Sequence, residues 1–210
     1  MKRPVAPAAV ARSEITVLNS RFIATAAPAF SVEEAREFIT RVKREFPDAT
    51  HHVPVYLIGH GASQVAHCQD DGEPPGTAGR PALAIVQGSG LGDIVLVVSR
   101  YFGGTKLGTG GLVRAYGDAA RAVLEALPRA EKVLTHTVQV ALPYALFERT
   151  RLSIATHRGR LMSTAFGEHA TITARFAVED FPAFESALQD LSGGTVRATI
   201  VETVTHLDPI

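Results

Sequence analysis

The feature that most constrains the fold of this chain is a glycine-rich connection between an apolar run and an amphipathic stretch. Residues 93–98 read D-I-V-L-V-V, and the uninterrupted apolar run after Asp93 predicts a strand buried on both faces. Residues 112–127 carry apolar side chains at helical spacing, which predicts an amphipathic helix ending before Pro128. Between them lies S-R-Y-F-G-G-T-K-L-G-T-G-G, with five glycines from Gly103 to Gly111. The chain is therefore expected to contain a buried strand, a glycine-rich turn and a helix in succession.

This turn is the best candidate for a binding site. Glycines let backbone N–H groups approach a ligand, and a helix N-terminus adds positive potential. The expected ligand is therefore an anion such as phosphate. With aromatic side chains beside the cations, the pattern favours a nucleotide or single-stranded RNA. The predicted contact residues are Arg100, Tyr101, Gly103, Gly104, Lys106, Gly108, Gly110, Gly111 and Arg114.

Two other interpretations of the turn stay open. The glycine order matches neither a P-loop nor G-x-G-x-x-G, so the glycines could serve only tight turns and close packing. Arg114, near the positive end of the predicted helix, is unfavourable without an anion unless Asp118, one turn on, pairs with it.

An acidic loop precedes the turn and has two interpretations. Asp70, Asp71 and Glu73 could hold Mg²⁺ against a bound phosphate. Alternatively, Asp71 or Glu73 pairs with Arg80 or Arg100 and organises the cationic turn, which we favour. We therefore expect a supporting loop made of Asp70, Asp71, Glu73 and Arg80, with no metal and no cofactor.

Composition narrows the possible classes of protein further. The chain is 46% apolar and 20% charged with zero formal net charge, so any RNA contact needs a local basic patch. A single cysteine, Cys68, allows no intrachain disulfide and fits a reducing cytoplasm. No apolar run reaches membrane-spanning length. No hydroxyl or histidine pattern indicates a catalytic constellation, so we lean against an enzyme and assign no catalytic residue.

The coarse pattern predicts two domains after a flexible tail at residues 1–13. In residues 14–134 it indicates strands and helices that form an α+β sandwich with helices on one sheet face. In residues 135–210 the order β-α-β-β-α-β is ferredoxin-like.

Two long motifs carry a family resemblance. S-R-Y-F-G-G-T-K-L-G-T-G-G-L-V-R-A-Y, preceded by D-D-G-E-P-P-G-T-A-G-R-P-A-L, closely resembles the YigZ/IMPACT family. The resemblance implies an Impact-type domain at 14–134, similar to the second domain of the small-subunit ribosomal protein of the S-five type, followed by a ferredoxin-like domain at 135–210.

The resemblance also implies a function. It implies a cytoplasmic translation-associated regulatory protein that binds RNA or the ribosome, with a possible protein partner in translation control. The alternatives are a Mg-dependent enzyme or sensor for a small phosphorylated ligand, and a protein-interaction module that uses the ferredoxin-like sheet face.

Overall fold

The computed structural model describes residues 3–210, and these divide into two compact units. The first unit reaches Lys132 and also includes Leu207–Ile210, and the second comprises Val133–His206. The strand β7 (Arg129–Leu142) and the strand β10 (Ala198–Pro209) belong partly to each unit.

The first unit is built on a five-stranded sheet with the order β2-β3-β6-β4-β5, in which all neighbours are antiparallel. Its strands are β2 (Ala11–Val17), β3 (Ser20–Pro28), β4 (His51–Ile58), β5 (Val65–Cys68) and β6 (Ile94–Tyr101). The central strand β6 is the predicted apolar run, and all residues from Ile94 to Val98 are fully buried. The prediction of a strand buried on both faces is confirmed.

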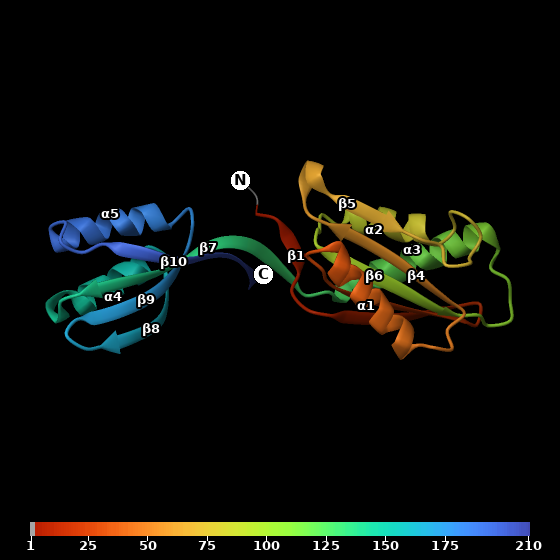
Figure 1. Cartoon of the computed structure of the whole chain (residues 1–210). Helices are drawn as coiled ribbons and strands as arrows, with labels where there is room; N and C mark the ends of the chain where they lie inside the picture. Colours follow the sequence, from red (N-terminus) through yellow and green to blue (C-terminus); the bar gives the residue numbers. More distant parts are fainter. Residues whose placement is uncertain (1–2) are drawn as a thin grey trace. The chain divides into compact units, whose positions relative to one another are not determined.

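Helices cover both faces of this sheet, not one as predicted (Figure 1). The helices α2 (Gly79–Gly88) and α3 (Gly108–Ala126) pack on the face that carries Ile94, Leu96 and Val98. The helix α1 (Val32–Glu45) packs on the opposite face, over Val95 and Val97. The prediction was wrong because it did not use the double-sided apolar character of β6, which requires cover on each side.

The expected flexible tail at residues 1–13 contributes strands instead. Met1 and Lys2 lie outside the described residues. The strand β1 (Val5–Pro7) pairs antiparallel with the start of β7, and β2 begins at Ala11. Backbone pairing therefore orders this segment, although its composition alone suggested no strand.

The second unit has the predicted β-α-β-β-α-β order. Besides β7 and β10 it contains α4 (Phe147–Thr156), β8 (Arg160–Phe166), β9 (Ala170–Ala177) and α5 (Phe181–Ser192). Within its sheet β7 pairs with β9 and β10, and β9 pairs with β8, which is the ferredoxin-like strand order. Both helices pack on one sheet face through Ile154, Phe184 and Leu188, against Ile172 and Phe176.

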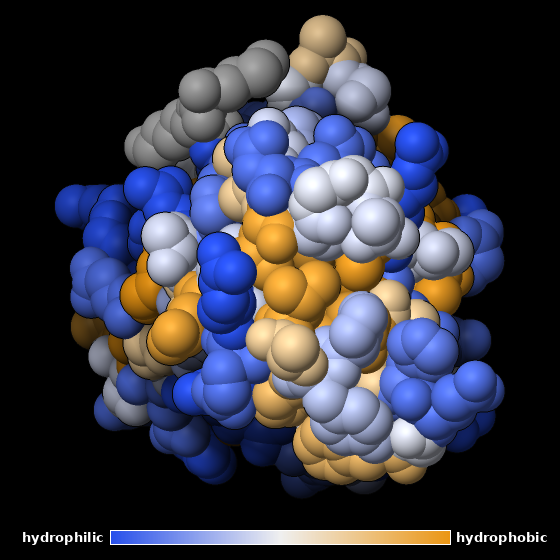
Figure 2. Space-filling view, turned by 90° about the vertical axis from the view of Figure 1, so that its left-hand side faces the viewer, coloured by the Kyte–Doolittle hydropathy of each residue, from blue (hydrophilic) through white to orange (hydrophobic). Residues whose placement is uncertain are grey.

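An apolar patch lies at the end of the second unit where α4 begins (Figure 2). The rings of Tyr144 and Phe166 stack with their centroids 6.2 Å apart, and Phe147 lies 5.3 Å from Phe166. Tyr144 is 53% exposed and Phe166 is 62% exposed. We call these three residues the aromatic patch. Among the described residues, no helix is long and apolar enough to cross a membrane.

Candidate functional site

The glycine-rich turn joins β6 to α3 and spans residues 102–107. Gly104 and Gly108 have positive φ angles of 83° and 73°, which favour glycine. Gly103 lies so close to the β2–β3 turn that a Cβ there would be 2.1 Å from the carbonyl carbon of Asn19. The fold itself therefore requires glycine at these three positions, as the packing interpretation of the turn predicted.

Gly110 differs from these three glycines, because the fold does not require glycine at its position. It lies in the first turn of α3, its φ is not positive, and an added Cβ would have no heavy atom within 4 Å. Glycine inside a helix costs about 0.5–1 kcal/mol relative to alanine. Nothing in the protein's own backbone or packing accounts for a glycine here, whereas close approach of a ligand would.

The N-terminus of α3 lacks a side-chain cap. Leu107 occupies the N-cap position and accepts no hydrogen bond from the helix through its side chain. The first four N–H groups of a helix have no partner within it, so the amides from Gly108 onward are available donors. Two earlier amides of the turn are already used, because the Phe102 amide donates to Thr50 and the Gly103 amide donates to Ser20.

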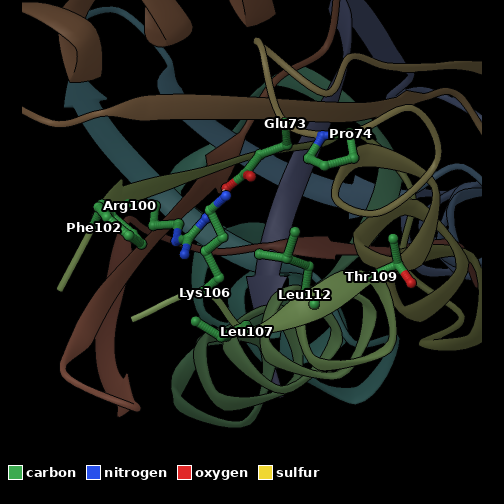
Figure 3. Close-up of a pocket in the computed structure, with 9 residues that line it drawn as sticks. Glu73, Pro74, Arg100, Phe102, Lys106, Leu107, Thr109 and Leu112 are labelled. Atoms are coloured by element: carbon green, nitrogen blue, oxygen red, sulfur yellow. The ribbon is translucent and has the colours of Figure 1, made fainter. Parts of the chain in front are cut away.

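A cavity of about 320 Å³ opens at this helix start. Its walls are mostly apolar, and Figure 3 shows the Lys106 side chain pointing into it. The lining residues are Glu73, Pro74, Arg100, Phe102, Lys106, Leu107, Gly108, Thr109 and Leu112. The volume lies within the range of small-ligand pockets.

A buried ion pair forms the floor of the cavity. Arg100, only 5% exposed, donates from Nη1 to Glu73 Oε1 at 2.6 Å, and the Tyr116 hydroxyl donates to the same oxygen at 2.7 Å. Burial, together with this hydrogen bond to a carboxylate, raises the pKa of Tyr116. Arg100 Nη2 donates to Ser20, and its Nε has no partner. Arg100 is thus neutralised by Glu73 and is not the free cation that the sequence suggested, although it lines the site.

The acidic loop is organised by its own hydrogen bonds. The Asp70 carboxylate accepts from the backbone amides of Gly76, Ala78 and Gly79 at 2.8–3.1 Å. Burial alone would raise the pKa of Asp70, but these donors hold it below its ordinary value. Asp71 accepts from Lys43 and from the His52 amide. Within residues 3–210 no group of three or more His, Cys, Asp or Glu is arranged to hold a metal ion.

The remaining predicted residues separate into two groups. Lys106 and Arg114 are exposed near the start of α3, and neither has a carboxylate partner in the part of the chain that the structure describes. Asp118 pairs with Arg121, so the alternative in which Asp118 pairs with Arg114 does not hold.

Tyr101 and Arg80 are not among the residues that line the cavity, and neither are Gly110, Gly111 and Arg114. Side chains alternate along β6, so Tyr101 points to the sheet face opposite Arg100. There its hydroxyl donates to Asp48, and the Arg21 guanidinium covers its ring. Arg80 is exposed near the start of α2 and has no ion pair in the described chain.

Sequence reasoning missed the apolar walls and the buried partners. Pro74, Leu107 and Leu112 were not singled out, because isolated apolar residues beside a turn resemble ordinary core. Tyr116 was assigned to the apolar face of the helix, and its hydroxyl gave no signal that it would meet Glu73.

Comparisons with known proteins match this architecture along nearly the whole chain. Residues 18–124 match the family model of the Impact N-terminal domain. The chain is 34% identical over 200 residues to the IMPACT family member YigZ of Escherichia coli (strain K12), covering 95% of this chain and 97% of the relative. It is 32% identical over 181 residues to the IMPACT family member YvyE of Bacillus subtilis (strain 168), covering 86% and 83%.

A solved structure supports the two-domain fold. A crystal structure described as that of a hypothetical protein is 34% identical to the chain and superimposes with a TM-score of 0.63, covering 96% of this chain and 98% of the other. The α+β architecture with an Impact-type first domain is thereby confirmed.

Proposed function

The chain belongs to the IMPACT family, and on that premise we propose that it is a cytoplasmic, translation-associated regulatory protein that binds RNA, free or within the ribosome, at the cavity where α3 begins. The observation that supports this most is Gly110. It leaves the helix N-terminus bare at a position where the fold has room for a larger side chain.

The polar end of the cavity suits a phosphate group. The uncapped amides of α3 point their N–H bonds outward, and the helix dipole adds to their positive potential. Lys106 points into the cavity and has no carboxylate partner among the described residues. Arg114 does not line the cavity, but one turn into the helix it adds a second positive charge without a carboxylate partner in the described chain.

The apolar part of the cavity suits a nucleobase. Phe102 is 47% exposed and lines the wall together with Pro74 and Leu107. A base that leaves its stack can pack against such a surface, whereas a paired base cannot reach it. The ligand that fits both ends is therefore one unpaired nucleotide of an RNA strand.

The magnesium-dependent alternative loses its proposed ligands. The oxygens of Asp70 and Asp71 already accept hydrogen bonds from the protein, and Glu73 is paired with Arg100. A free nucleotide could still occupy the cavity without a metal. Thermal unfolding with and without nucleotide and Mg²⁺ separates the cases, because a ligand that binds the folded state raises its unfolding temperature.

The protein-interaction alternative has a specific observation of its own, the aromatic patch of the second unit. Exposed apolar patches often mark contacts with other proteins, and tyrosine is enriched among the residues that carry such contacts. This observation supports a surface at the start of α4, whereas the sequence suggested the sheet face. If the chain associates with ribosomes through a protein that binds this patch, Phe166→Ser should abolish ribosome association. Substitutions in the cavity should then leave ribosome association intact.

The direct test is RNA binding by charge variants. We expect a fluorescent single-stranded RNA to bind with an affinity that falls steeply between about 50 and 200 mM salt. Lys106→Gln should weaken binding about tenfold, since a charged hydrogen bond to phosphate is removed. Arg44→Gln, an exposed arginine on α1 across the sheet, is the matched control and should bind normally. Absence of salt-sensitive binding to RNA and ribosomes would defeat the proposal.

A further inference from the structure

Two arginines face each other on the sheet of the second unit. Arg160 on β8 pairs directly with Arg175 on β9, so the two side chains lie on the same face of the sheet. Ala174 and Phe176, the neighbours of Arg175 along β9, are buried in the core under the helices. Because side chains alternate along a strand, both arginines project from the face that α4 and α5 leave uncovered.

No carboxylate in the described part of the chain pairs directly with these arginines. Like charges directly opposite each other on neighbouring strands are destabilising. Within residues 3–210 neither arginine forms an ion pair. Arg158 has a carboxylate neighbour, Asp180, but that pair is separate. An anion that bridges the two guanidinium groups would remove the repulsion.

The row of the sheet that contains these arginines also holds two polar atoms without a hydrogen-bond partner. Arg175 pairs across to Thr137 on β7, so the three residues follow one another across three strands. The Nε of Arg175 and the Oγ1 of Thr137 are buried without a hydrogen-bond partner. Buried polar atoms normally have one, and those without one call for an explanation.

The next row of the same face carries hydroxyl and amide groups. Ser163, Thr173 and Gln139 are paired across β8, β9 and β7 in this neighbouring row. Neither row carries an aromatic side chain that could stack on a base. The face therefore suits phosphates and ribose hydroxyls, which carry little sequence information, and not base edges.

We infer that Arg160 and Arg175 form a phosphate-binding site for an RNA backbone on the open sheet face of the second unit. The choice of RNA rests on the proposed function, whereas the phosphate site rests on the arginine pair alone. The site is separate from the cavity at α3, and each can be removed without touching the other.

The test compares RNA binding by the wild type, a double variant and a control. Arg160→Gln/Arg175→Gln removes both charges and keeps polar side chains. Arg149→Gln, an exposed arginine on α4 without an ion pair in the described chain, is the control. We expect the double variant to bind a single-stranded RNA about tenfold more weakly. The slope of log affinity against log salt should fall by about 0.7 for each phosphate that the variant no longer neutralises. Its unfolding temperature without ligand should be unchanged or higher, because the repulsion is gone.

The possible results separate this inference from the proposed function. If the double variant binds RNA as the control does while Gly110→Ala does not, the arginine site is wrong and the cavity stands. If the double variant fails to bind and Gly110→Ala binds normally, the arginine site stands and the cavity is wrong. If inorganic phosphate raises the unfolding temperature of the wild type but not of the double variant, and RNA affinity is equal in both, the ligand is free phosphate and the RNA inference is overturned.

Discussion

Arg100 and Glu73 form an ion pair at 2.6 Å that is almost completely removed from solvent, with 5% and 3% of their side chains exposed. They come from the central strand and from the acidic loop, which are 27 residues apart in sequence. The pair therefore fixes the loop against the sheet and sets the floor of the cavity.

Removing the charge of Glu73 should destabilise the fold strongly. In Glu73→Gln the buried Arg100 keeps its charge without a counterion, and breaking a buried pair in this way typically costs about 3–5 kcal/mol. Tyr116→Phe removes only one hydrogen bond and should cost about 1 kcal/mol. The free energy of unfolding in urea measures both.

The exposed pair of Arg21 and Glu14 provides the control for this prediction. Their side chains are 51% and 45% exposed, and such pairs contribute about 0–1 kcal/mol. If Glu73→Gln were no more destabilising than Glu14→Gln, the ion pair would not hold the loop.

Alanine at Gly103 should be poorly tolerated. Its Cβ would lie 2.1 Å from the carbonyl carbon of Asn19 and 2.5 Å from the Ser20 amide nitrogen, and these are backbone atoms that move only with the β2–β3 turn. Forced overpacking of this kind costs about 1–3 kcal/mol. A melting temperature equal to that of the wild type would show that the turn does not pack as described.

Asp70 should make stability depend on acid pH. Because its folded pKa is below the ordinary value, it contributes stability that is present above its unfolded pKa of about 3.9 and is lost as pH falls through the folded pKa. Asp70→Asn should therefore lower the free energy of unfolding by about 1.5–3 kcal/mol at neutral pH. The difference from wild type should shrink steadily below about pH 4. A difference that stayed constant from neutral pH down to about pH 2 would contradict the assignment.

Local sequence patterns were sufficient for much of the fold. The apolar run of β6 and the alternating order of the second unit were recognisable because periodicity reports directly on burial. The start of α1 carries the local pattern S-V-E-E, a capping box, and Ser31 accepts a hydrogen bond from the Glu34 amide. The strand β1 was missed because its three residues are held by distant partners on β7, which no local pattern reveals.

A cavity lies at the predicted turn, but the charges around it are distributed differently from the prediction. Arg100 and Lys106 are both cationic in sequence, yet one is neutralised by Glu73 and the other lines an open cavity. Tyr101 was grouped with Arg100 because they are adjacent, although alternation along a strand sends them to opposite faces. Tertiary pairing between distant parts of the chain determines which charged side chains remain unpaired. The sequence alone therefore could not show which of the two cations is free.

The most direct test of the account is the RNA affinity of Gly110→Ala. The alanine has room and suits a helix, so the unfolding temperature should be unchanged or slightly higher. Its methyl group would project from the first turn of α3, beside the amides that are expected to receive a phosphate, so binding of single-stranded RNA should weaken about tenfold or more. Gly88→Ala, at the last residue of α2 with the same free space, should bind like the wild type. Equal RNA affinity in Gly110→Ala and Gly88→Ala would contradict the claim that a ligand accounts for the bare start of α3.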